Sequence, residues 1–139
     1  MTKCESSMAR VIAALVPLLF VSATARAQSS PDDAVAKITQ LNKDAVAAYQ
    51  AQKYDDARKI LKQALDLSDA SGLEQHPITA RTHIHMGIVI MVGFKQRDLG
   101  IKQFKKALEI ESTINLTKSL VTPELTQAFA EAKGAGGAT

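Results

Sequence analysis

Apolar residues recur at intervals of three and four along almost the whole chain between residues 31 and 132. This spacing places them on one face of an α-helix, whereas a half-buried strand would alternate at every second residue. Only the run 88–92, which is rich in β-branched side chains, would suit a strand equally well, and its helical surroundings favour a helix. The pattern therefore predicts an all-α protein. The first apolar stripe consists of Val35, Ile38, Leu41, Ala45, Ala48 and Tyr49.

Capping residues and turn residues indicate where these helices begin and end. Ser30 followed by Pro31 is a strong helix start, because a hydroxyl caps free amide groups and proline is favoured in the first turn. Pro77 opens another segment in the same way, and Gly72 can end a helix in the left-handed conformation. We expect helices over about 31–52 and 54–71, a third from Pro77, a turn at Gly93 and residues 95–98, a fourth ending near Glu111, and a short fifth from 122–124.

The N-terminal residues have the three parts of a secretory leader. Lys3 and Arg10 supply positive charge, residues 11–21 form an apolar run, and Ala25 and Ala27 are the small residues that a signal peptidase reads. The run is about half as long as the roughly 20 residues that a membrane-spanning helix needs. We expect cleavage after Ala27 and a periplasmic or secreted product. The expected organisation is a signal peptide over 1–27, a helical domain over 28–133 and a flexible tail over 134–139.

Charge and cysteine content exclude several classes of function. The formal net charge is +3, and a chain cut after residue 27 keeps 14 basic and 13 acidic residues. A nearly neutral protein lacks the electrostatic attraction on which most nucleic-acid binding depends. The single cysteine, Cys4, lies in the leader. The mature chain would therefore have no thiol for catalysis, for a disulfide or for a cysteine metal site.

Two segments of the helical region share one pattern. Residues 54–67 place Ala57 and Ala64 between large apolar side chains, and residues 98–110 repeat the arrangement around Ala107. This pattern resembles the second helix of a tetratricopeptide repeat, in which alanines let neighbouring helices pack closely. Ala64 and Ala107 are 43 residues apart, longer than the family's period of about 34, and the loop around 73–79 accommodates the excess. The stretch 120–125 looks like the closing segment of exported bacterial repeat proteins.

The resemblance implies a short solenoid of about two antiparallel helix pairs, closed by a fifth, capping helix. It also implies that a partner lies in the groove between the first helices of the two pairs. An alternative is that Val89 and Val92 pack against the fifth helix, which would then fill the groove. The groove positions carried over to this sequence are Asn42, Val46, Tyr49, His85, Val89 and Val92.

A basic stretch follows the third helical segment. It has two interpretations: an ordinary solvated surface, or a docking patch for an acidic protein segment or an anionic envelope surface. Base stacking is not expected, because the nearby Phe104 belongs to an apolar stripe. The patch consists of Lys95, Arg97, Lys102, Lys105 and Lys106.

Catalytic and metal-binding patterns are weak. His83 and His85 are two residues apart, so on a helix they point about 200° away from each other and are poorly placed to share a metal. No serine lies in a Gly-x-Ser-x-Gly turn, and the glycines do not form a phosphate-binding loop. We therefore expect no catalytic residues, cofactor or metal, and the protein is expected not to be an enzyme.

Together these features predict a non-catalytic adaptor or scaffold of an envelope assembly that binds a protein or peptide segment in its helical groove. Self-association is an alternative, because two repeats are fewer than the three or so that usually bury a continuous core. A second alternative is a small-ligand or metal-binding envelope protein that uses His76, His83 and His85. No nucleic-acid partner is expected.

Overall fold

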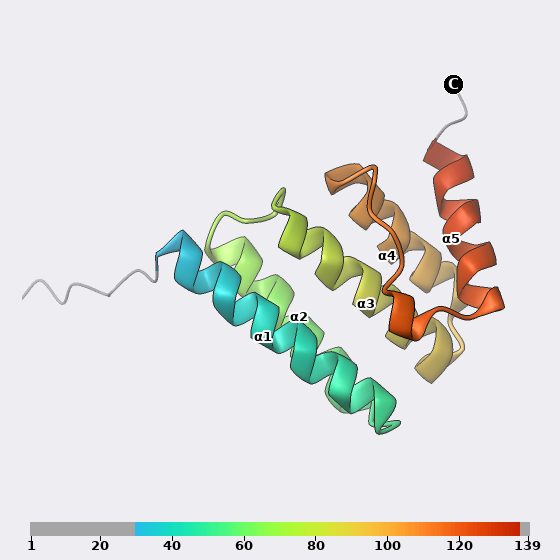
Figure 1. Ribbon diagram of the computed structural model, residues 1–139, viewed down its shortest axis with the longest axis horizontal. Helices are drawn as coiled ribbons and strands as arrows, with labels where there is room; N and C mark the ends of the chain where they lie inside the picture. The colour runs from blue at the N-terminus through green and yellow to red at the C-terminus, as the bar shows by residue number, and fades with distance from the viewer. Residues whose placement is uncertain (1–29, 137–139) are drawn as a thin grey trace, which may run out of the picture.

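The computed structural model describes residues 30–136, and every regular element within that range is helical. Figure 1 shows α1 beside α2 and α3 beside α4, with α5 at the end of the stack. This is the predicted all-α solenoid of two helix pairs with a capping helix. The predicted signal peptide over 1–27 and residues 137–139 of the predicted tail lie outside the described residues. The elements are α1 (Pro31–Gln50), α2 (Tyr54–Ala70), α3 (Pro77–Phe94), α4 (Arg97–Ile110), the 3-10 turn η1 (Lys118–Leu120) and α5 (Pro123–Gly136).

The start of α1 is a complete capping box. The Asp33 amide donates to the Ser30 hydroxyl at 3.2 Å, and the Ser30 amide donates to the Asp33 carboxylate at 3.3 Å. Two of the amide groups that a helix start leaves without partners are thereby satisfied. The predicted start at Ser30-Pro31 is confirmed.

Helices α1 and α2 pack through small and branched residues. Ala57, Leu61 and Ala64 of α2 are fully buried, as are Ile38 and Ala45 of α1. The alanines let the two helices approach closely, and the leucine and isoleucine fill the space between them. The apolar spacing of this helix predicts an inner face of Ala57, Leu61, Ala64, Leu65 and Ser68, and all of these are buried except Leu65, which is only partly buried.

Helix α3 is the centre of the molecule. It contacts α1, α2 and α4, and its residues from Ile84 to Met91 are all buried. A helix surrounded on several sides is apolar around most of its circumference. This explains why residues 88–92 resemble a strand in sequence and yet form a helix.

Glycines set the distance between α3 and its neighbours. A Cβ atom added at Gly93 would lie 2.6 Å from the Cβ of Tyr54 on α2. The sequence-based assignment of Gly93 to a turn is therefore wrong: the residue lies inside α3, where it makes room for Tyr54. The chain turns at Lys95, as predicted for residues 95–98, and the φ of 56° at Lys95 places it in the left-handed region; α4 then begins at Arg97.

The contact between α3 and α4 is equally tight at Gly87, and this gives a first prediction. Gly87→Ala is expected to lower the free energy of unfolding by about 1–3 kcal/mol, because overpacking a filled core costs that much. The added Cβ would lie 2.6 Å from Cε1 of Phe104. Chemical denaturation measures the change. Gly134→Ala on α5 is the matched control, since no neighbouring atom lies within 4 Å of its added Cβ. Equal stability of the two variants would contradict this packing.

Helix α5 covers the outer side of the second pair. Phe129 meets Phe104 of α4 edge-on, with ring centroids 5.6 Å apart, and Leu125 is fully buried beside them. This is the capping role predicted for the fifth helix. The helix continues to Gly136, so residues 134–136, assigned to the flexible tail from sequence, belong to α5.

Candidate partner-binding surface

The predicted groove residues come from α1 and α3, the first helices of the two pairs. These helices touch each other directly. Val46, Tyr49, His85 and Val89 line one small gap between them. The fold thus gathers residues that are far apart in the sequence onto one face, which we call the α1–α3 face.

This face is covered by the chain itself. After α4, residues 111–122 return across α3 before α5 begins, and Figure 1 shows η1 lying over α3. We call residues 111–122 the returning segment. Its Leu120 closes the gap lined by Val46, Tyr49 and Val89, and the remaining space is too small for a water molecule. The sequence left open whether the groove holds a partner or whether Val89 and Val92 pack against the fifth helix. In the structure Leu120 of the returning segment closes the gap beside Val89, and Val92 packs against the cluster that contains the apolar residues of α5.

Polar contacts hold the returning segment to α3. The Thr117 hydroxyl lies 2.9 Å from Nε2 of His85. Nη1 of Arg81 donates to the Asn115 carbonyl at 2.7 Å and lies 3.5 Å from the Thr117 hydroxyl. His85 and Arg81 are one helical turn apart, so they present two polar groups to the same stretch of the segment.

His85 is a buried, neutral imidazole. Burial lowers its pKa from 6.5 to about 4, and the positive charge of Arg81 contributes in the same direction. Its Nδ1 has no hydrogen-bond partner among the described residues. A neutral histidine with one nitrogen bonded to a hydroxyl acts here as a hydrogen-bonding group rather than as a charge.

Asn42 joins α1 to α3. Only 4% of the residue is exposed, and its Nδ2 donates to the Thr82 hydroxyl at 3.0 Å. Its Oδ1 is buried and lacks a partner within residues 30–136. Asn42 therefore lies beneath the surface of the α1–α3 face.

The two valines differ in depth. Val89 is 2% exposed and packs with Ala45 and Leu61. Val92 is partly buried against the cluster that contains Leu120 and the apolar residues of α5. A partner that reached this face would thus first meet Val46, Tyr49 and Val92, each of which keeps some exposed surface.

The predicted basic patch lies along α4 and the turn before it. Arg97 is paired with Glu131 of α5 at 2.7 Å. This hydrogen bond raises the pKa of Arg97 and lowers the pKa of Glu131. Lys102 and Lys106 are exposed, whereas Lys105 is half-buried. Arg97 therefore connects α4 to α5, and Lys95 remains as a further exposed cation of the set.

The three histidines serve three separate contacts. His76 caps α3, its Nδ1 accepting from the Ile78 amide at 3.1 Å. His83 lies 2.8 Å from Oε1 of Gln103 on α4, and burial lowers its pKa. His85 contacts Thr117 instead. In the described part of the chain, no group of three or more histidine, cysteine or acidic residues is placed to hold a metal ion.

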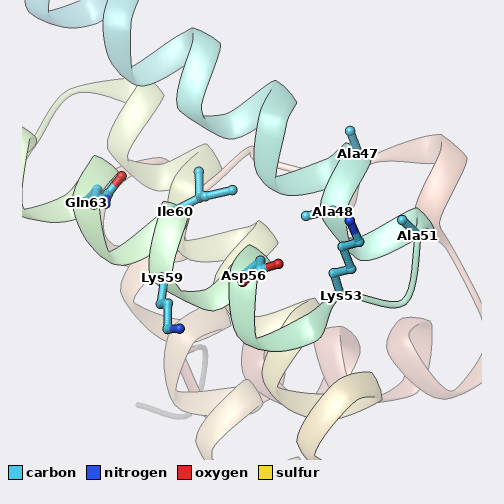
Figure 2. Close-up of a pocket in the computed structure, with 8 residues that line it drawn as sticks. All are labelled: Ala47, Ala48, Ala51, Lys53, Asp56, Lys59, Ile60 and Gln63. Atoms are coloured by element: carbon cyan, nitrogen blue, oxygen red, sulfur yellow. The ribbon is translucent and has the colours of Figure 1, made fainter.

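A second surface was not anticipated from the sequence. Figure 2 shows an open hollow where α1 ends and α2 begins, with alanines on one side and Ile60 on the other. Its volume is about 550 Å³. The run of alanines near the end of α1 was the available signal, because small exposed side chains leave a depression between helices. The lining residues are Ala47, Ala48, Ala51, Lys53, Asp56, Lys59, Ile60 and Gln63.

The family model of the tetratricopeptide repeat matches residues 39–112, more than half of the chain. The matched region begins within α1 and ends just after α4, so it covers both helix pairs. The chain belongs to the tetratricopeptide repeat family. Repeats of this family generally mediate protein–protein interactions, which supports an adaptor role and a protein partner. No curated protein and no solved structure gives a significant match.

None of the helices within residues 30–136 is long and apolar enough to cross a membrane.

Proposed function

We propose that this chain is an exported, non-catalytic adaptor or scaffold of a cell-envelope assembly, released into the periplasm or secreted after cleavage behind Ala27. Its task is to hold a segment of a partner protein. Membership of the tetratricopeptide repeat family supports a protein partner. The leader-like sequence of residues 1–27 supports export.

The observation that carries the proposal is that the fold gathers Val46, Tyr49 and His85, from α1 and α3, around one gap, which Leu120 of the returning segment occupies in this structure. Two apolar side chains beside a buried polar group form the kind of surface that recognises an extended or helical segment: the apolar groups contribute affinity and the polar group contributes specificity. The exposed lysines of α4, Lys102 and Lys106, lie outside this face and would attract an acidic flank of the partner.

Affinity capture from the envelope fraction of the source organism tests the proposal, with residues 28–139 as bait. Tyr49→Ala is expected to reduce capture of the specific partner at least tenfold, because Tyr49 lines the α1–α3 face. Tyr54→Ala is the matched control: it removes a neighbouring aromatic ring, whose centroid lies 5.7 Å from that of Tyr49, but Tyr54 is not among the residues that line the gap. Circular dichroism verifies that both variants fold.

A third variant tests which of the two surfaces binds the partner. Ala47→Glu places a charge in the hollow between α1 and α2 and should leave capture unchanged. Loss of capture with Ala47→Glu but not with Tyr49→Ala would show that the partner binds in that hollow and not at the α1–α3 face. Recovery of the bait alone with every variant would refute the adaptor proposal and favour self-association, which sedimentation of the purified chain would then reveal as a doubled mass.

A further inference from the structure

The returning segment packs against the helices mainly through its side chains, and its Ile114 and Leu120 are buried in the core cluster. Apart from η1 it forms no regular structure, and its backbone-to-backbone hydrogen bonds are local, such as Leu120 N to Thr117 O at 2.8 Å. Only one of its main-chain groups, the Asn115 carbonyl, bonds to a side chain of α3. Side chains therefore supply most of its attachment, as they do for a ligand in a groove.

These side chains follow a defined spacing. Leu116 packs partly buried against the apolar cluster, Thr117 places its hydroxyl against His85, and Leu120 enters the gap beside Val89. The order is leucine, hydroxyl residue, two further residues, leucine. In this chain the two further residues, Lys118 and Ser119, are exposed, so they contribute little to the fit.

The segment leaves part of the recognition chemistry of the face unused. The Oδ1 of Asn42 and the Nδ1 of His85 are both buried and have no partner among residues 30–136. Asn42 is 4% exposed and His85 is 7% exposed. Of these two residues only His85 contacts the segment, whereas Asn42 lies beneath the face and donates to Thr82. Buried polar atoms of native proteins nearly always have hydrogen-bond partners, so the His85 Nδ1 indicates a polar group at this face that the segment does not satisfy.

We propose that the α1–α3 face is a peptide-binding site that the returning segment occupies as an internal ligand. Its external ligand is an extended segment of a partner protein with the same leucine–hydroxyl–x–x–leucine spacing, which displaces residues 114–120. This inference rests on the proposed function, because it specifies the segment that the adaptor would hold. It also predicts weak binding by the unsubstituted chain, since only the fraction of molecules with an open face can bind.

The test uses a fluorescent peptide with the sequence of residues 112–122 and measures its binding to the chain 28–139 by anisotropy. The variant Arg81→Ala/Thr117→Val removes both polar attachments of the internal segment without altering Leu120. It also leaves His85 available to the threonine of the peptide. We expect the peptide to bind this variant at least tenfold more tightly than it binds the unsubstituted chain.

Two controls make the result specific. The variant Arg58→Ala/Thr39→Val carries the same two kinds of substitution away from the returning segment, because Arg58 pairs with Asp55 and Thr39 bonds the Val35 carbonyl. It should bind like the unsubstituted chain. A peptide with Thr117→Val and Leu120→Asp should lose at least tenfold in affinity for the Arg81→Ala/Thr117→Val variant. Hydrogen exchange at residues 114–120 reports whether the internal segment has loosened.

Equal affinity of the peptide for the variant and the unsubstituted chain would overturn the inference. So would absence of binding when exchange at residues 114–120 has become faster. The outcome is separable from that of the proposed function, because the peptide assay contains no envelope protein. Peptide binding without any captured partner would refute the adaptor and keep the site, whereas capture that depends only on Ala47 would keep the adaptor and refute the site.

Discussion

Acidification from pH 7 to pH 4 is expected to lower the free energy of unfolding by about 3 kcal/mol through His85 alone. Burial holds the pKa of this imidazole at about 4 in the folded protein, against 6.5 in the unfolded chain. Between these values the unfolded chain binds a proton that the folded chain does not, so unfolding becomes more favourable as the pH falls. The contribution of the neutral His85 to the free energy of unfolding is therefore complete above pH 6.5 and is lost progressively as the pH falls to 4.

The measurement is urea unfolding at several pH values for the unsubstituted chain and for His85→Gln. Glutamine can still hydrogen-bond the Thr117 hydroxyl but does not titrate. The difference between the two profiles isolates the histidine, because the carboxylates titrate in both proteins. His83→Gln is the control, since the His83 pKa is lowered by a less complete burial and its removal should change the profile less. Profiles of the unsubstituted chain and His85→Gln that run parallel from pH 7 to pH 4 would contradict the burial of His85.

Truncation of Phe104 is expected to have the other large effect. Phe104→Ala should lower the free energy of unfolding by about 3–5 kcal/mol, because it opens a cavity where α3, α4 and α5 meet. The ring is fully buried, lies close to Gly87 and packs edge-on against Phe129. A loss of this size is a large fraction of the stability of a domain of about 100 residues.

Phe94→Ala is the matched control for this truncation. Phe94 is partly buried at the end of α3, with the Arg58 guanidinium 4.3 Å above its ring. Its removal should cost roughly half as much or less, because solvent and neighbouring side chains can fill the space. Thermal and urea unfolding of the two variants give the comparison. Similar losses for both would show that Phe104 is not the central packing residue.

The helix pairs could be predicted because their determinants are local. Ser30 caps α1 together with Asp33, three residues further along the chain. The spacing of Ala57, Leu61 and Ala64 defines one buried face of α2. Periodicity and capping act over three or four residues, and the same pattern recurs around Ala107. The family assignment follows from this recurrence.

Other features could not be read in this way. Gly93 has the composition of a turn residue, and only the approach of Tyr54 from another helix shows that it belongs inside α3. The hollow beside Ala47 and Ile60 depends on how α1 and α2 diverge near their connection. The first feature depends on a helix that is distant in sequence, and the second depends on the angle between two helices. Neither leaves a periodic signal in the sequence.

The candidate site was predictable in part. The sequence, through its family resemblance, placed Val46, Tyr49, His85 and Val89 on one face, and α1 and α3 bring them together. It did not indicate that the chain would cover this face. The contact between His85 and Thr117 joins residues 32 positions apart, and the returning segment lacks the periodicity that would reveal which side of it is buried.

The sequence by itself thus determined the helices, their pairing and the family, since periodicity and capping act over a few residues and short connections join the two helices of each pair. The tertiary structure decided which surface is open and which is occupied. That outcome depends on the path of residues 111–122 across α3, and it is set by side chains such as Arg81 and Leu120 that meet only after the helix pairs have packed.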